Sequence, residues 1–160
     1  MASISDLPVK HRLFLGTYRW RALDPVLFAR PRKPLSEMTL ALITTGGLSA
    51  PGQLPFDENA RGGDSSFRLI PGDVDVKTLA SHQRSESFDH SGFEADRNLG
   101  FPLDRLREMS ARGAVGPLAP RHLSFMGSIT APGRLIKETA PAAADELLAD
   151  GVDAVLLVPL

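Results

Sequence analysis

The residue types best suited to chemistry in this chain gather in a polar loop. His82 and Asp89 lie in the polar stretch 81–100, together with His90. Neutral imidazoles beside a carboxylate can transfer a proton or bind a divalent metal, although this spacing matches no standard metal motif. Solvated loop histidines are the alternative. We therefore take His82 and Asp89 as candidate catalytic residues and predict no metal.

A second candidate is the pair Arg121-His122, which follows the apolar run 114–119. This run predicts a buried strand. In a parallel sheet, ligands bind just beyond the carboxyl ends of the strands, so we expect Arg121 and His122 at that edge of the sheet. There His122 would be a catalytic acid or base, and Arg121 would line a substrate pocket. The alternative is a histidine that bonds to the backbone and shapes a loop.

Two further groups are candidates for substrate binding. In the segment 63–68, Asp64 could accept a hydrogen bond from a substrate ammonium group, and the Arg68 guanidinium could bind a carboxylate. An Asx turn, in which Asp64 caps local N–H groups, is the alternative. Thr45 precedes Gly46-Gly47, where backbone N–H groups could bind an anion. A plain strand-ending turn is the other interpretation of that segment.

The elements that must position these groups follow from the apolar runs and the turn residues. We expect strands at 38–45, 67–70, 114–119 and 153–160, and helices at 102–113 and 139–150. A long loop at 48–66 separates the first two strands. The alternation of strand and helix predicts an α/β fold of three layers, Rossmann- or flavodoxin-like, with a largely parallel sheet. The last strand, with four consecutive apolar residues, is expected to be buried on both faces in the sheet.

Composition narrows the class of protein. The chain has 160 residues, of which 42% are hydrophobic and 23% charged, and this predicts one globular core. The net charge of −1 gives no electrostatic case for nucleic acid, and no apolar run approaches the roughly 20 residues of a membrane-spanning helix. No secretory signal is visible, so we expect a cytoplasmic protein. The chain contains no cysteine, and any thiol chemistry must therefore come from elsewhere.

The chain is expected to have two parts. Residues 1–36 are basic and aromatic, and they predict an N-terminal arm and connector. Residues 37–160 predict the α/β domain.

Within residues 37–160, five strings occur in a recognisable order. They are Ile43-Thr44-Thr45-Gly46-Gly47, GDSSFRLIP at 63–71, FPLDRL at 101–106, APRHLSFMG at 119–127 and DGVDAVLLVP at 150–159. Together they resemble the selenoprotein B family of glycine, sarcosine and betaine reductases and D-proline reductase, especially its shorter, proline-reductase-like members.

The resemblance implies reductive cleavage of a C–N bond in a small amino acid or amine, with electrons from a thiol donor. In such relatives a selenocysteine-x-x-cysteine or cysteine-x-x-cysteine pair directly follows the equivalent of 155–160, and its selenolate or thiolate is the attacking species. The site residues in this interpretation are the catalytic His122, His82 and Asp89, and the substrate-binding Arg121, Asp64, Arg68 and Thr45. A homo- or hetero-oligomer is also expected.

The redox pair is absent from the 160 residues, so we expect the domain to be incomplete at its C-terminus and this chain alone to be inactive. A UGA selenocysteine codon read as a stop is our first explanation, and a natural homologue without the redox centre is the second. The alternative function is that of a non-catalytic binding or assembly subunit, which would dock a partner through its N-terminal arm.

Overall fold

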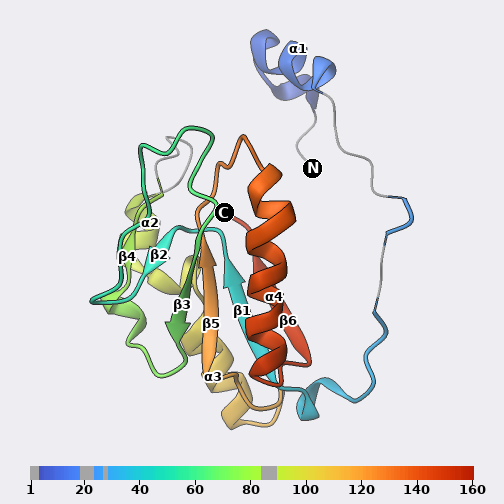
Figure 1. Ribbon diagram of the computed structural model, residues 1–160, viewed down its shortest axis with the longest axis vertical. Helices are drawn as coiled ribbons and strands as arrows, with labels where there is room; N and C mark the ends of the chain where they lie inside the picture. Colours follow the sequence, from blue (N-terminus) through green and yellow to red (C-terminus); the bar gives the residue numbers. More distant parts are fainter. Residues whose placement is uncertain (1–3, 19–23, 27–28, 84–89) are drawn as a thin grey trace. The chain divides into compact units, whose positions relative to one another are not determined.

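The computed structural model describes the chain except for residues 1–3, 19–23, 27–28 and 84–89 (Figure 1). The chain divides into two units, residues 1–30 and 31–160. The first unit contains the 3-10 helix η1 (Ile4–Asp6) and the helix α1 (Val9–Thr17), and neither of them buries a residue. The second unit holds the sheet and all the other elements described below.

Four strands form one sheet in the order β3-β5-β1-β6. Their bounds are β1 Leu40–Thr44, β3 Phe67–Pro71, β5 Arg121–Phe125 and β6 Ala154–Val158. β1 runs parallel to both β5 and β6, and β3 runs antiparallel to β5. The expected α/β class with a mostly parallel sheet is therefore confirmed.

The remaining elements of the second unit connect or cover these strands. They are β2 (Leu48–Ser49), β4 (Ala80–Ser81), α2 (His90–Ala95), α3 (Leu103–Ala111), α4 (Ala140–Ala149), the 3-10 turns η2 (Leu35–Glu37), η3 (Val76–Thr78) and η4 (Arg97–Leu99), and the π-helical turn η5 (Leu135–Thr139). β2 and β4 pair antiparallel in a separate small sheet. Within the described residues, none of the helices has the length and apolar character that crossing a membrane requires.

The sheet lies between α4 and α3, which cover opposite faces (Figure 1). Side chains alternate along a strand, so Ala41 and Leu42 of β1 point to opposite faces. Ala41 belongs to a buried cluster with Leu147 of α4, whereas Leu42 belongs to a second cluster with Leu106 of α3. Both clusters are built from apolar side chains, and together they hold β1 at the centre of three layers.

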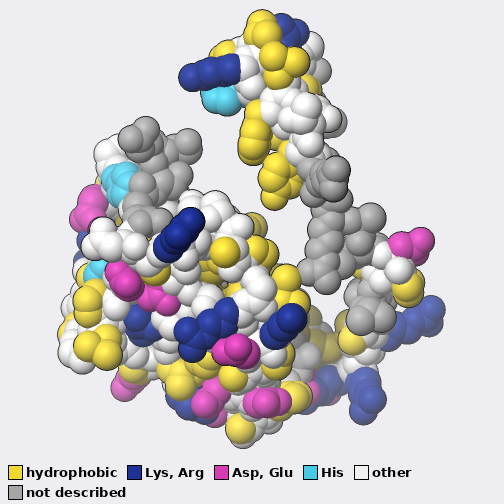
Figure 2. Space-filling view, turned by 45° about the horizontal axis from the view of Figure 1, so that its top comes forward, with side chains coloured by type: hydrophobic (Ala, Val, Ile, Leu, Met, Phe, Trp, Pro, Cys, Tyr) yellow, Lys and Arg dark blue, Asp and Glu magenta, His cyan; other side chains and the backbone are white. Residues whose placement is uncertain are grey.

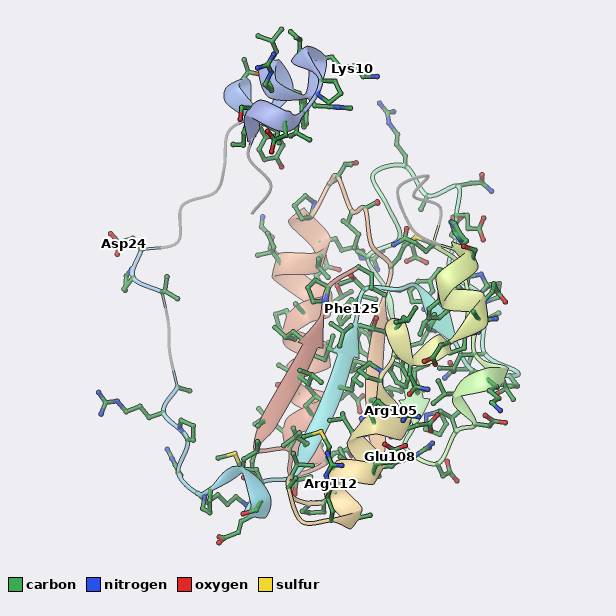
Figure 3. The ribbon with its side chains drawn as sticks, turned by 180° about the vertical axis from the view of Figure 1, so that it is seen from behind. Lys10, Asp24, Arg105, Glu108, Arg112 and Phe125 are labelled. Carbon is green, nitrogen blue, oxygen red and sulfur yellow. The ribbon has the colours of Figure 1, made fainter. Side chains whose placement is uncertain are left out.

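α3 and α4 lie where the sequence predicts them. Each is followed by a glycine in the left-handed region, Gly113 at φ +72° and Gly151 at φ +69°, which ends a helix without steric cost. The outer face of α3 carries Arg105 and Glu108, which form an ion pair at 2.9 Å (Figure 3). Thr139, at the start of the expected helix, does not cap α4, because η5 runs directly into the helix and the Thr139 hydroxyl has no hydrogen-bond partner.

The strand expected at 114–119 is displaced along the chain. Before Pro120 this segment makes one isolated bridge to β1, and the regular strand β5 begins only at Arg121. Prolines have no N–H to donate to a ladder, and Pro117 and Pro120 both interrupt the run. Arg121 and His122 consequently open the strand instead of following its end.

β6 was expected in the buried centre of the sheet. This is wrong for the part of the chain that the structure describes, where β6 is an edge strand paired only with β1. Val155 and Leu156 are both more than a third exposed, and Leu157 is 66% exposed. The apolar character of the strand is therefore not matched by burial.

Candidate functional site

The carboxyl ends of β1, β5 and β6 meet at one edge of the sheet, which Figure 2 turns toward the viewer. The turn after β1 joins its neighbours there: the Thr45 N–H donates to Val158 O at 3.2 Å, and the Gly47 N–H donates to Phe125 O at 2.8 Å. The Gly46 N–H donates to the Thr44 hydroxyl at 3.0 Å. The three N–H groups of residues 45–47 are thus bonded within the protein, as in a strand-ending turn.

The Thr45 side chain contacts Leu160, which lies two residues after the end of β6. Its Oγ1 accepts a hydrogen bond from Leu160 N at 2.8 Å and donates to the Leu160 main-chain oxygen at 3.3 Å. The Thr45 carbonyl accepts from the Gln83 side-chain amide at 3.4 Å. Thr45 and Gln83 therefore tie together the turn after β1, the end of β6 and the segment after β4.

His82 lies behind the same turn. The main-chain N–H of His82 donates to Gly47 O at 2.9 Å, because β4 pairs with β2 and places His82 alongside the turn. The imidazole shares a 2.9 Å hydrogen bond between Nε2 and the Ser49 hydroxyl, and its Nδ1 lies 3.6 Å from the Glu58 carboxylate. The buried Phe56 ring packs against the imidazole at a centroid distance of 6.2 Å.

These three side chains form a chain from solvent to the interior. Glu58 is half exposed, the His82 side chain is 15% exposed and Ser49 is buried. An imidazole between a carboxylate and a hydroxyl can hold a proton or pass it on. Asp89, the other residue expected from this loop, lies outside the described residues. Among the residues that the structure describes, no three His, Asp or Glu side chains gather in a way that could hold a metal ion.

Asp64 and Arg68 lie together, but they bond to the long loop itself. Asp64 accepts hydrogen bonds from Asp57 N, Ser66 N and the Ser66 hydroxyl, with distances of 2.6 to 2.9 Å. Burial raises the pKa of Asp64, but these hydrogen bonds and the Arg68 charge outweigh burial and leave the pKa below its usual value. The hydrogen bond from Ser66 N to Asp64 closes the Asx turn that was the alternative interpretation of this segment.

The Arg68 guanidinium holds the preceding part of this loop. It donates to Leu54 O at 2.7 Å and to Pro55 O at 2.8 Å, and it stacks 4.1 Å above the Phe56 ring. The same Phe56 ring packs against the His82 imidazole. Arg68 therefore supports the aromatic ring that lies next to that histidine. Arg68 also holds the long loop in place through its hydrogen bonds to the loop main chain.

Arg121 was expected at the carboxyl edge, and this position is wrong. It opens β5 at the amino end, where its guanidinium bonds both carboxylate oxygens of Asp150 at 2.8 and 2.9 Å and contacts Glu146 at 2.9 Å. The hydrogen bonds from Arg121 lower the pKa of Asp150. The arginine thus joins the start of β5 to the end of α4.

His122 is also at the amino end of β5 instead of the expected carboxyl edge. It is fully buried, its Nδ1 accepts a hydrogen bond from Leu42 N at 3.2 Å, and its Nε2 has no partner. Burial, with a smaller contribution from the Arg107 charge, lowers the pKa of His122 to about 4, so the ring is neutral at neutral pH. His122 thus bonds to the backbone, which was the alternative to a catalytic role.

The irregular start of β5 explains the position of His122. Between the Leu40–Leu118 bridge and the Ile43–Leu123 pair, β5 contains two more residues than β1. This bulge interrupts the ladder, and the imidazole supplies the acceptor that Leu42 N would otherwise lack. His122 therefore has a structural role in joining β5 to β1.

The structure thus brings Thr45 and His82 to the carboxyl edge, joins Asp64 of the long loop to Arg68 of β3, and separates Arg121 and His122 from both. Sequence reasoning missed Ser49, Glu58 and Gln83. The pairing of β2 with β4 brings Ser49 and the segment of Gln83 to His82, and strands of two residues have no periodicity to detect. Glu58 lies in the long loop, where no sequence pattern marks it.

Comparison with known proteins gives a consistent family. Residues 8–159 match the family described as glycine/sarcosine/betaine reductase selenoprotein B. D-proline reductase subunit gamma of Acetoanaerobium sticklandii is 36% identical over 134 residues, which is 83% of this chain and 53% of the relative. No solved structure matches the chain.

Two other relatives are named components of reductase complexes. Glycine reductase complex component B subunit gamma of Carboxydothermus hydrogenoformans is 34% identical over 127 residues, and sarcosine reductase complex component B subunit beta of Peptoclostridium acidaminophilum is 30% identical over 131 residues. Each match covers 78% of this chain and 28% of the relative. The chain therefore spans about half the length of the proline reductase subunit and less than a third of the other two.

Proposed function

Because the chain belongs to the glycine/sarcosine/betaine reductase selenoprotein B family, we propose that it serves in a multi-subunit reductase that cleaves a C–N bond of a small amino acid or amine. The observation that carries this proposal is the family match, which runs from residue 8 to residue 159 and so includes every strand of the sheet. Relatives that are named subunits or components of reductase complexes support a role within an assembly.

The proposed reaction consumes two electrons and two protons. The C–N bond breaks, and the carbon and the nitrogen each gain a hydrogen. A dithiol supplies the two electrons and the two protons as it becomes a disulfide. Since the chain contains no cysteine, the sulfur or selenium of that donor lies outside these 160 residues.

We place the reacting atoms at the carboxyl edge of the sheet, where ligands of parallel sheets generally bind. His82 supplies a proton to the departing nitrogen. Its hydrogen bond to Ser49 and its approach to Glu58 support this role, because they orient the ring beside the turn after β1. Arg121 and His122 are left out of the proposed site, since they lie at the other end of β5.

We also infer that the sheet is of the doubly wound, Rossmann- or flavodoxin-like kind. The parallel trio β5-β1-β6 and the helices α4 and α3 on opposite faces support this interpretation.

A non-catalytic assembly subunit is the second candidate. One observation favours it: α1 exposes the apolar side chains of Val9, Leu13 and Phe14 beside the cations Lys10 and Arg12. An exposed apolar helix face is a common docking element for a protein partner. In this alternative, Phe14→Glu releases the partner subunits, and no reductase activity depends on His82.

The test uses the protein purified from its own cells together with the subunits that accompany it. The complex is incubated with dithiothreitol and, in turn, with proline, glycine, sarcosine and betaine. We expect one substrate to be consumed, with release of an amine or, for a cyclic substrate, a ring-opened product two hydrogens heavier. Mass spectrometry detects both. Failure of the complex to turn over any of the four would contradict the proposal.

A further inference from the structure

The geometry points to Thr45 as a positioning residue for the proposed reaction: its hydroxyl holds the main chain of Leu160 at the carboxyl edge, where glycines leave room for the Leu160 side chain. The inference rests on the proposed function and gives Thr45 a role different from substrate binding. Four separate segments carry the contacts: the turn after β1, the end of β6, the residue before Phe101 and the turn after β5.

The Thr45 hydroxyl takes the place of a main-chain group in the ladder between β1 and β6. The regular ladder ends with the Thr44–Val158 pair, and Pro159 has no N–H to extend it. Leu160 N then donates to Thr45 Oγ1 at 2.8 Å, and the same hydroxyl donates to the Leu160 main-chain oxygen. A hydroxyl can do both because it is donor and acceptor at once.

The Thr45 carbonyl is meanwhile turned to another partner. It accepts from the Gln83 side-chain amide at 3.4 Å, so the main chain of Thr45 bonds to the segment after β4 while its side chain bonds to the end of β6. The two contacts place Thr45 between these segments. A shift of either segment therefore changes the position of Leu160.

Three glycines lie close to Leu160 and its partners. A Cβ on Gly46 or on Gly100 would lie 2.9 Å from the Leu160 Cδ1 atom, and a Cβ on Gly127 would collide with the Gln83 amide and lie 3.0 Å from Thr45 O. None of the three has a positive φ, so glycine is needed here for close approach and not for backbone conformation.

The Leu160 residue is 43% exposed, yet one hydroxyl binds both of its main-chain polar groups. Ligands of parallel α/β sheets bind in the crevice just beyond the carboxyl ends of the strands, which is where Leu160 lies. Since a misplacement of about 1 Å can cost about a hundredfold in rate, holding this point is a catalytic requirement in the proposed reductase.

The test compares Thr45→Val, which keeps the shape and removes the hydroxyl, with Thr45→Ser, which keeps the hydroxyl, in the purified reductase complex. We expect Thr45→Val to lower kcat by about tenfold to a hundredfold, with KM within about twofold of the unmodified value. Thr45→Ser should restore most of kcat. Thr78→Val, an exposed threonine in η3, is the matched control and should leave both constants unchanged.

Amide hydrogen exchange at Leu160 supplies an independent readout, because it reports the Thr45 contact directly. We expect faster exchange in Thr45→Val and protection in Thr45→Ser, with circular dichroism confirming that each variant folds. An unchanged exchange rate and an unchanged kcat in Thr45→Val would overturn the inference. So would a raised KM with kcat unchanged, which indicates substrate binding. Absence of turnover in the unmodified complex contradicts the proposed function, whereas altered kcat with unaltered exchange contradicts only the positioning role.

Discussion

Two histidines, His122 at the start of β5 and His82 directly after β4, lie in opposite surroundings. His122, at the amino end, is fully buried, has one nitrogen without a partner, and is kept neutral because burial lowers its pKa to about 4. His82 lies near the carboxyl end, where its ring reaches solvent and shares a hydrogen bond with Ser49 while facing Glu58. The residue type is the same, but only His82 contacts a side-chain hydroxyl and a carboxylate.

The comparison shows that burial and partners decide the role of a polar residue. His122 completes the ladder at a bulge, where the acceptor for Leu42 N would otherwise be missing. A charge on that ring would be buried in an apolar cluster beside Phe101, at a ring distance of 6.0 Å. His82 instead lies beside the Ser49 hydroxyl and the Glu58 carboxylate. We therefore expect changes at His122 to alter stability and changes at His82 to alter activity.

The largest effect is expected for His122→Ala. The substitution leaves a cavity between β1 and α3 and removes the acceptor of Leu42 N, and we expect a loss of about 4 kcal/mol in the free energy of unfolding. Urea denaturation measures it. The control is His122→Asn, whose side-chain oxygen can take the position of Nδ1 and should lose less. A loss below about 1 kcal/mol in His122→Ala would show that the bulge does not depend on the imidazole.

The pH dependence of stability sharpens the same contrast. The unfolded chain binds a proton at His122 below its ordinary pKa of 6.5, whereas the folded chain does so only below about 4. Between these values the unfolded state holds more protons, so stability is full above pH 6.5 and falls as pH is lowered toward 4, by about 3 kcal/mol. Unfolding measured at several pH values checks this. His122→Asn should flatten the curve, and an equally steep curve in that variant would assign the effect to another group.

His82→Asn is expected to affect the reaction more than the fold. Loss of a general acid typically costs about a hundredfold or more in rate, so we expect kcat of the reductase complex to fall by about a hundredfold. Ser49→Ala is the control, because it removes the partner and keeps the imidazole, and its effect should be smaller. Steady-state kinetics on the complex measures both. Equal kcat values for His82→Asn and the unmodified complex would remove His82 from the proposed site.

Part of this fold could be predicted from the sequence. β1 is a continuous apolar run ended by Gly46-Gly47, and α3 and α4 have apolar residues at helical spacing with a glycine after each. In these segments local preference and final environment agree. The start of β5 could not be predicted in the same way, because the run 114–119 is as apolar as a strand, yet prolines remove the N–H groups that a ladder needs.

The candidate site was less predictable than the fold. The expectation for Arg121 and His122 depended on the strand ending at residue 119, and moving its start to Arg121 transferred both side chains to the other end of the sheet. Conversely, Ser49 approaches His82 through a pairing of two residues in each strand, and Glu58 approaches it from the long loop. Short strands and ion pairs depend on tertiary position, which a single sequence does not contain.

The smallest effect is expected at Arg121, and it tests whether the amino end of β5 takes part in the reaction. Arg121→Gln removes the ion pairs to Asp150 and Glu146, which are partly exposed and therefore screened by solvent. We expect a small loss of stability, less than that of His122→Ala, with kcat and KM of the complex within about twofold of the unmodified values. The matched variant Asp150→Asn should show a smaller stability loss, since it breaks the Asp150 contact from the other side and leaves the Glu146 ion pair in place. A KM raised tenfold in Arg121→Gln but not in Asp150→Asn would mean that the guanidinium binds substrate, and the division between a structural and a reactive end of β5 would then be wrong.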